Sequence, residues 1–196
     1  MSPVTPAVTI SIAAPPGGGK TTLSRLLAAK LGDVPILHFD DYEAFTRRGP
    51  AEVEAWLSRG APIGEIAAPG FAEELARLRR SGARHVVVDA PVGRAHPATA
   101  AMIDVLIFLD TPLDIALARV IHHQASLAAQ STVPAAARDF TSWLEGYLRN
   151  YAGFMRRTYD VQRATVMPQA DLVLDGTLTP ERLVELALPL IVERTP

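Results

Sequence analysis

Five short runs of apolar residues are spaced along the chain, and each has the length of a β-strand. Their apolar residues are continuous rather than alternating with polar ones, as expected for strands that helices cover on both faces. The runs predict strands at 8–13, 35–39, 85–89, 105–109 and 171–174. A sheet assembled from them would lie in the interior of the protein.

Helical periodicity occupies most of the sequence between these runs. Apolar positions recur at helical spacing in segments 21–31, about 71–81, 112 to about 128, about 136–160 and 180–193. Strands that alternate with helices favour a parallel sheet with right-handed crossovers, so we predict an α/β fold of three layers, α/β/α. A chain of 196 residues suits one hydrophobic core, and we expect a single domain over 1–196.

Composition narrows the classes of protein that need to be considered. The net charge is −2, so no basic field favours nucleic acid as a partner. The chain has no cysteine, which excludes disulfides and thiolate metal sites and favours a reducing compartment. No apolar run approaches the about 18 residues that suggest a membrane span, and the first residues do not resemble a signal peptide. We therefore expect a cytoplasmic protein with no membrane partner.

The segment APPGGGKTT at 14–22 lies directly between the first predicted strand and the first predicted helix. Its spacing, A-x-x-x-x-G-K-T, is that of a phosphate-binding loop with Ala14 at the position where glycine is usual. Glycines let successive backbone N–H groups turn toward phosphate oxygens, and the following helix adds unpaired N–H groups. The residues assigned to ATP are Pro16, Gly17, Gly18, Gly19, Lys20, Thr21 and Thr22.

Two residues of this segment have more specific expected roles. Lys20 should reach the β- and γ-phosphates, and the Thr21 hydroxyl should bind Mg²⁺. A purely structural turn would explain the glycines, but it would not explain Lys20 and Thr21 in register.

Carboxylates follow the second and third predicted strands. Asp40 and Asp41 end the second strand, and Asp89 ends the third. Parallel strands bring their carboxyl ends to one edge of the sheet, so these side chains should face the phosphate-binding loop and could bind Mg²⁺ or accept a proton. Asp40 is the expected general base, Asp41 is a second candidate, and Asp89 is expected near the metal. Aspartates here could instead cap a helix.

Segment 43–70 is an insertion rich in glycine and proline around a short helix. Because it follows the second strand, it is placed to form the pocket for a phosphoryl acceptor. Tyr42, Arg94 and His96 are the candidate acceptor contacts, the last two because they follow Asp89 closely.

A lid is expected over about 119–149. Arg119 lies on the helix after the fourth strand, and its planar fork of donors would suit a transferring phosphoryl group. The alternative is that this arginine, like most arginines on helices, only lies on a solvated face.

The chain resembles the P-loop small-molecule kinases of the uridine kinase, nicotinamide riboside kinase and phosphoribulokinase group. The segments that carry the resemblance are APPGGGKTTLSRLLA at 14–28, FDDY at 39–42, VVVDAP at 86–91, DVLIFLDTPLDIALAR at 104–119 and ADLVLDG at 170–176. The resemblance implies a five-stranded sheet in the order 2-3-1-4-5, Mg–ATP as phosphoryl donor and a hydroxyl as acceptor. It also implies that Asp40, the first carboxylate of the group's Asp-x-aromatic motif, is the base.

The sequence departs from this group at three places. Val120, His123 and Gln124 stand where the group's lid carries arginine, arginine and aspartate. Asp89 stands where glutamate is common. In and around the insertion, the aromatic residues available for a nucleoside pocket are Tyr42, Phe45, Trp56 and Phe71.

Three functions are consistent with these motifs. The first is an ATP-dependent phosphotransferase that acts on a hydroxyl of a nucleoside, a riboside or a similar metabolite, with ATP and that acceptor as its partners. The second is a regulatory nucleotide-binding NTPase, although the chain lacks an N-K-x-D guanine motif. The third is a toxin-like kinase of a nucleotide sugar, which would differ only in its pocket.

Overall fold

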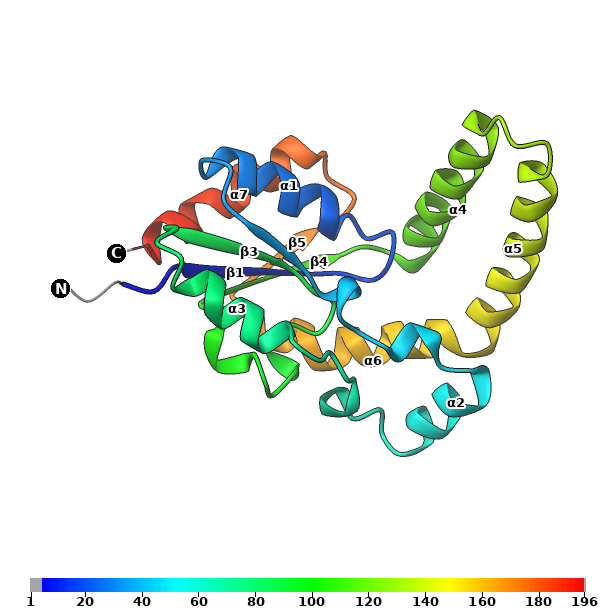
Figure 1. Ribbon diagram of the computed structural model, residues 1–196, viewed down its shortest axis with the longest axis horizontal. Helices are drawn as coiled ribbons and strands as arrows, with labels where there is room; N and C mark the ends of the chain where they lie inside the picture. The colour runs from blue at the N-terminus through cyan, green and yellow to red at the C-terminus, as the bar shows by residue number, and fades with distance from the viewer. Residues whose placement is uncertain (1–4, 196) are drawn as a thin grey trace.

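A five-stranded parallel sheet forms the centre of the computed structural model, which describes residues 5–195 (Figure 1). Its strands are β1 (Val8–Ala13), β2 (Ile36–His38), β3 (His85–Asp89), β4 (Val105–Asp110) and β5 (Leu172–Asp175). The strand order is β2-β3-β1-β4-β5, and every pairing is parallel. The predicted α/β sandwich and its order 2-3-1-4-5 are therefore confirmed.

Two hydrophobic cores cover the faces of the sheet, one on each side. Helices α1 (Lys20–Lys30) and α7 (Pro180–Glu193) lie over one face, and α3 (Phe71–Arg79) and α6 (Arg156–Val166) lie over the other (Figure 1). Alternate residues of β3 belong to different cores. Val87 packs toward α1 and α7, whereas Val86 and Val88 pack toward α3 and α6. This two-sided burial explains why the strands read as continuous apolar runs.

The insertion at 43–70 joins β2 to α3, and its buried side chains belong to the same hydrophobic core as those of α3. It contains η2 (Phe45–Arg47), α2 (Pro50–Ser58) and η3 (Ile63–Glu65). Trp56 is 3% exposed, and its indole N–H donates a hydrogen bond to the Pro62 carbonyl oxygen at 3.1 Å. The Glu52 carboxylate accepts a hydrogen bond from the Gly49 N–H at 2.9 Å, which stabilises the start of α2.

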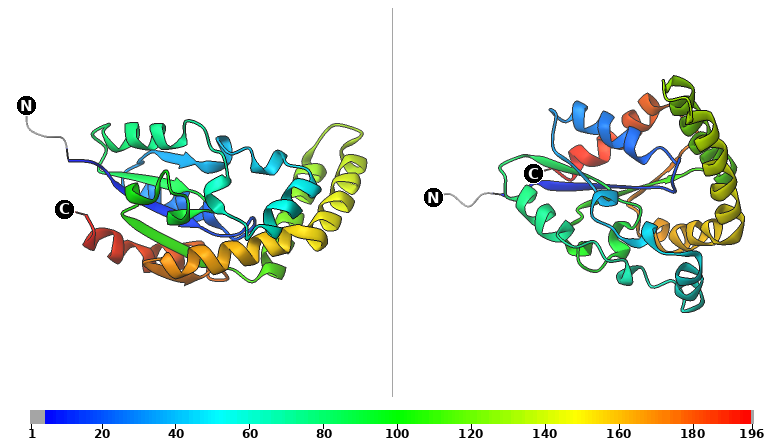
Figure 2. Two further views of the ribbon diagram at one scale, coloured as in Figure 1. Left: turned by 90° about the horizontal axis from the view of Figure 1, so that it is seen from below. Right: turned by 45° about the vertical axis from the view of Figure 1, so that its right-hand side comes forward.

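Helices α4 (Leu113–Gln130) and α5 (Ala136–Asn150) form a pair that projects beyond the carboxyl ends of the strands (Figures 1 and 2). Helix α5 continues through η6 (Tyr151–Met155), a π-helical turn, into α6. The helix predicted at 136–160 thus runs further, to Val166, and contains this turn. Within 5–195, no helix is both long enough and apolar enough to cross a membrane.

His85 is a buried titratable residue at the start of β3. It is 6% exposed, and its Nε2 lies 2.9 Å from the Thr195 hydroxyl. Burial lowers the pKa of His85, and the charge of Arg84 adds to the decrease. Below about pH 6.5, where a histidine of an unfolded chain becomes protonated, the unfolded state binds more protons than the folded state. The contribution of His85 to stability is therefore present above that pH and lost as the pH falls.

We predict that His85→Gln makes the free energy of unfolding less dependent on pH between about pH 7 and pH 5, because it removes this group. Urea denaturation over that range measures the dependence. His122→Gln, at an exposed histidine of α4, is the matched control and should keep the wild-type slope. Equal slopes in the wild type and His85→Gln would contradict the assignment.

Candidate active site

The loop between β1 and α1 has the backbone of a phosphate cradle. Gly17 and Gly19 adopt positive φ angles of 77° and 98°. A Cβ atom on Gly17 would lie 2.1 Å from the Ala116 carbonyl oxygen, so this position has no room for a side chain. Two physical reasons therefore require glycine in this loop. The φ angles are positive, and the Ala116 carbonyl oxygen lies close to Gly17.

Side chains from two other elements hold this loop. The Thr111 hydroxyl, after β4, donates a hydrogen bond to the Gly18 carbonyl oxygen at 2.9 Å. The Gln162 amide, on α6, donates to the carbonyl oxygens of Ala14 at 3.0 Å and Pro91 at 2.7 Å. Thr111 and Gln162 are not among the site residues predicted from the sequence. Neither residue belongs to a recognisable sequence motif, so no local pattern indicates its role.

Lys20 lies between the two predicted carboxylates. Its Nζ is 3.6 Å from Asp40 Oδ2 and 3.6 Å from Asp89 Oδ1. The Thr21 hydroxyl donates to Asp89 Oδ2 at 2.6 Å. The Asp40 side chain is 66% exposed, whereas that of Asp89 is 4% exposed. The structure thus brings together the predicted loop residues, Asp40 and Asp89.

His38 also belongs to this cluster, although the sequence predicts no role for it. Its Nδ1 lies 3.1 Å from Asp89 Oδ2, because β2 and β3 pair in a register that sets these two residues side by side. Asp89 therefore contacts the loop through Lys20 and Thr21, and contacts β2 through His38. The sequence feature that could have indicated this contact is the position of His38 at the end of a strand.

The Thr21 hydroxyl and the Asp89 carboxylate fit the requirements of Mg²⁺. Asp89 Oδ1 is buried and has no hydrogen-bond partner among the described residues, so an oxygen ligand is available beside the Thr21 hydroxyl. Residues 5–195 contain no cluster of three His, Cys, Asp or Glu side chains that could hold a metal ion. A magnesium ion here would take its remaining ligands from phosphate oxygens and water, as is usual for this ion.

A cavity of about 660 Å³ opens beside Lys20 and Asp40. The insertion forms one wall, the end of α5 with η6 and α6 forms the other, and Pro16 of the loop lies at the same end as Lys20. The volume is within the range of small-molecule sites. The expectation that 43–70 helps to form a pocket is therefore supported by the residues that line this cavity.

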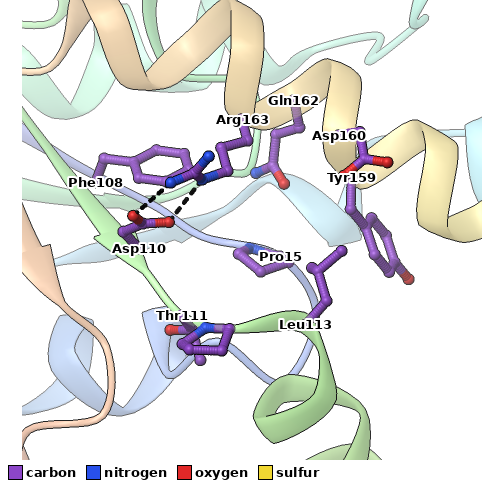
Figure 3. A pocket seen from close by; sticks show the side chains of 10 residues that line it. Pro15, Phe108, Asp110, Thr111, Leu113, Tyr159, Asp160, Gln162 and Arg163 are labelled. Carbon is purple, nitrogen blue, oxygen red and sulfur yellow. Dashed lines mark hydrogen bonds and ion pairs between the residues drawn. The ribbon is translucent and has the colours of Figure 1, made fainter.

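A second cavity of about 300 Å³ lies between Pro15 of the loop, the end of β4 and α6 (Figure 3). Arg163 Nε and Nη2 donate to the two oxygens of Asp110, each at 2.8 Å, as the dashed lines in Figure 3 show. These hydrogen bonds lower the pKa of Asp110. Tyr159 and Gln162 line both cavities, so α6 separates them.

Arg119 lies beside the phosphate-binding loop. Its Nη1 donates to the Gly176 carbonyl oxygen at 2.9 Å and is 4.0 Å from the position of a Cβ atom on Gly19. It comes from α4, and it is not among the residues that line the larger cavity. A contact between Arg119 and a bound nucleotide stays a prediction.

Two of the proposed acceptor contacts lie elsewhere. Arg94 donates to the carbonyl oxygens of Ile103 and Asp104 and to the Asp171 carboxylate, so it joins the starts of β4 and β5, at the opposite edge of the sheet. Its expected contact with the acceptor is therefore not supported, because the chain reverses after β3 and carries Arg94 away from Asp89.

His96 and Tyr42 make their contacts outside the larger cavity. His96 is 8% exposed, and its Nε2 lies 3.0 Å from the Ile66 carbonyl oxygen. The Tyr42 ring packs against Phe71, with ring centroids 5.5 Å apart. Neither lines the cavity in this structure, so their expected contact with the acceptor is not supported. Asp41 is exposed, and Lys20 pairs with Asp40 rather than with it.

Comparison with known proteins identifies the fold. No protein-family model matches the chain, and no curated protein matches it. Among solved structures, a protein provisionally named a fructose transport system kinase from Silicibacter sp. TM1040 is similar at 19% identity and a TM-score of 0.56, over 86% of this chain and 90% of that one. A sugar kinase from Janibacter sp. HTCC2649 is similar at 18% identity and a TM-score of 0.52, over 94% of both chains.

The fold of this chain is therefore that of P-loop kinases. At these sequence identities, the likeness extends to the fold alone. The activity has to be argued from the residues of the site.

We predict that Gln162→Met lowers the free energy of unfolding by about 1–3 kcal/mol, because the carbonyl oxygens of Ala14 and Pro91 lose this donor. Urea denaturation measures the loss, and calorimetry should show weaker nucleotide binding. Gln169→Met, at an exposed glutamine of the same helical region, is the control and should change stability by less than about 0.5 kcal/mol. Equal stability of both variants would exclude a supporting role for Gln162.

Proposed function

We propose that the chain is an ATP-dependent kinase that transfers the γ-phosphoryl group of Mg–ATP to a hydroxyl group of a small molecule. The observation that carries the proposal is the position of Lys20. Its ammonium group lies between Asp40 and Asp89, where the phosphate-binding loop meets a cavity large enough for an acceptor.

The loop and its cation would bind and orient the donor. Backbone N–H groups of the glycines and of the start of α1 would hold the phosphates, and Lys20 would exchange its carboxylate contacts for the β- and γ-phosphates. The Thr21 hydroxyl and the Asp89 carboxylate would hold Mg²⁺. When bound, this ion neutralises the charge that develops on the phosphate oxygens.

Asp40 would orient and deprotonate the acceptor. Its carboxylate lines the cavity next to Lys20, and so can meet both the hydroxyl and the donor phosphates. The hydroxyl oxygen bonds to the γ-phosphorus, the bond from that phosphorus to the bridging oxygen of ADP breaks, and the hydroxyl proton passes to Asp40. Positioning and charge neutralisation supply most of the catalysis.

The resemblance of several segments to the uridine kinase group supports this proposal, and we include membership of that group in it. The shared fold of two solved kinases is consistent with it. A regulatory NTPase would need no acceptor cavity at the phosphate end of its site, so the cavity beside Lys20 favours an enzyme over a switch. A kinase of a nucleotide sugar would need room and polar partners for a diphosphate in the same cavity.

We predict that Lys20→Ala abolishes turnover, because the phosphates lose their cation. Asp40→Asn should lower kcat by about 10²- to 10⁴-fold with ATP still bound, because the amide cannot accept the proton. Acceptor-dependent ADP release measures kcat, and calorimetry measures ATP binding.

The matched control is Asp41→Asn, which removes the neighbouring exposed carboxylate. It should keep kcat within about threefold of wild type, a change that corresponds to less than 1 kcal/mol. Normal turnover by Asp40→Asn, or equal losses in the two variants, would exclude Asp40 as the specific base.

A further inference from the structure

Arg48 lines the larger cavity from the side of the insertion, directly after η2. Its Nη2 donates a hydrogen bond to the Glu65 carbonyl oxygen at 3.3 Å, and its guanidinium lies over the Phe45 ring, 5.0 Å from the centroid. The Glu65 carboxylate itself pairs with Arg59 at 2.8 Å. Among residues 5–195, no carboxylate forms an ion pair with Arg48. Two neighbours therefore orient this cation, but no side chain neutralises it.

The carboxylates that line the same cavity have other partners. Among the described residues, they are those of Asp40 and Glu43. Asp40 pairs with Lys20 at 3.6 Å. Both oxygens of the buried Glu43 accept hydrogen bonds from Thr46, one from its N–H at 3.0 Å and one from its hydroxyl at 2.6 Å. The charge of Arg48 therefore remains available to a bound anion.

The guanidinium of Arg48 also has donors to spare. An arginine side chain presents five N–H donors in one plane and stays charged at every physiological pH. One donor of Arg48 is engaged, at the Glu65 carbonyl oxygen. The others suit the paired oxygens of a carboxylate or a phosphate, and hydrogen bonds to such charged groups are stronger than those between neutral groups. Arg48 thus has the charge and the free donors of an anion-binding residue.

Arg48 and the cation of the donor site belong to different parts of the structure. Lys20 begins α1 and contacts Asp40 and Asp89, whereas Arg48 is held against Glu65 within the insertion. In Figure 1, the insertion with α2 lies on the other side of the sheet from α1. The donor phosphates would already have the loop N–H groups and Lys20 to bind them. Arg48 is therefore placed to bind the acceptor rather than the donor.

Neutral polar groups without a partner line the opposite wall. The Tyr159 hydroxyl is buried and has no hydrogen-bond partner among the described residues. Burial raises the pKa of Tyr159, and the neighbouring Tyr147 adds to the increase, so this hydroxyl keeps its proton and can donate it. The side-chain amide of Asn150, at the end of α5, forms no hydrogen bond within the described part of the chain. Because a buried polar group without a partner is costly, this wall suits a ligand with polar atoms.

We infer that the acceptor carries a negatively charged group, a carboxylate or a phosphate, in addition to the hydroxyl that is phosphorylated, and that Arg48 binds this group. The inference rests on the kinase function proposed above and specifies its substrate class. The hydroxyl meets Asp40 beside Lys20, and the charged group lies against Arg48. A riboside or a simpler hydroxy compound can carry such a group, so the inference agrees with the kinase group included in the proposed function.

Binding is measured separately from catalysis. The chain has two tryptophans, so Trp143→Phe leaves Trp56, which lines the cavity, as the single fluorescent reporter. A non-hydrolysable ATP analogue and Mg²⁺ are present at saturation, so that the phosphate-binding loop cannot take up the added anion. The compounds titrated are pairs that differ in one charged group: ribose 5-phosphate with ribose, shikimate with its methyl ester, and orotidine with uridine.

In at least one pair, the anionic member should bind at least about tenfold more tightly than the neutral one, which corresponds to 1.4 kcal/mol. A preference for ribose 5-phosphate alone would identify a phosphate as the bound group. A preference for shikimate or orotidine would identify a carboxylate. Either result supports the inference.

Phosphoryl transfer to the same pairs is measured as acceptor-dependent ADP release with Mg–ATP. Arg48→Gln should raise the KM for the anionic acceptor about tenfold or more and leave the KM for ATP unchanged, because it removes the charge that binds the acceptor. The KM for the neutral member should stay the same, which separates loss of the charge from a folding defect. Arg48→Lys keeps the charge without the planar fork and should lose less affinity.

The matched control is Arg47→Gln, at the neighbouring exposed arginine of η2, which does not line the cavity. Its KM values should match those of the wild type. Equal effects of Arg48→Gln and Arg47→Gln would overturn the assignment of the anion to Arg48. Equal rises in the KM for ATP and for the acceptor in Arg48→Gln would place Arg48 at the donor and would also overturn it.

The remaining outcomes separate the inference from the function on which it rests. An anion preference that disappears in Arg48→Gln, without phosphoryl transfer to any compound, would support the anion site and overturn the kinase. Transfer without a preference within any pair would overturn the anion site and leave the kinase intact. Absence of binding by every anionic member would overturn the anion site as well.

Discussion

The buried carboxylate of Asp89 is the group around which the site is arranged. A charge that is only 4% exposed is costly unless other groups compensate it, and here Lys20, Thr21 and His38 all face it. Lys20 and Thr21 belong to the start of α1, and His38 ends the neighbouring strand. The contacts of this one carboxylate therefore fix the relative positions of the first turn of α1, the end of β2 and the end of β3.

A second constraint couples the loop to the helix behind it. Gln162 reaches from α6 to the carbonyl oxygens of Ala14 and Pro91, and Tyr159 of the same helix lines both cavities. Burial raises the pKa of Tyr159, and the neighbouring Tyr147 adds to the increase, so this hydroxyl keeps its proton. A movement of α6 would therefore displace both the phosphate-binding loop and the wall of the larger cavity that α6 forms.

The cavity proposed for the acceptor and the donor site meet at Lys20 and Asp40. In the proposed kinase, backbone N–H groups and Lys20 would hold the phosphates, and the acceptor would lie in the cavity beside them. The low polarity of the acceptor side also strengthens the charge interactions at the reacting end. Selection of the acceptor by the proposed kinase would then depend on the insertion and η6, which line this cavity.

The sequence by itself determined the sheet, the phosphate-binding loop and the roles expected of Lys20 and Asp89, because these depend on local spacing and on the apolar pattern of strands. Only the tertiary structure decided that Arg94 lies at the opposite edge of the sheet and that Gln162 supports the loop. It also decided that Phe154 faces the insertion. These contacts join segments that are far apart along the chain. Local pattern carries no information about which distant side chains meet, since packing sets those pairs.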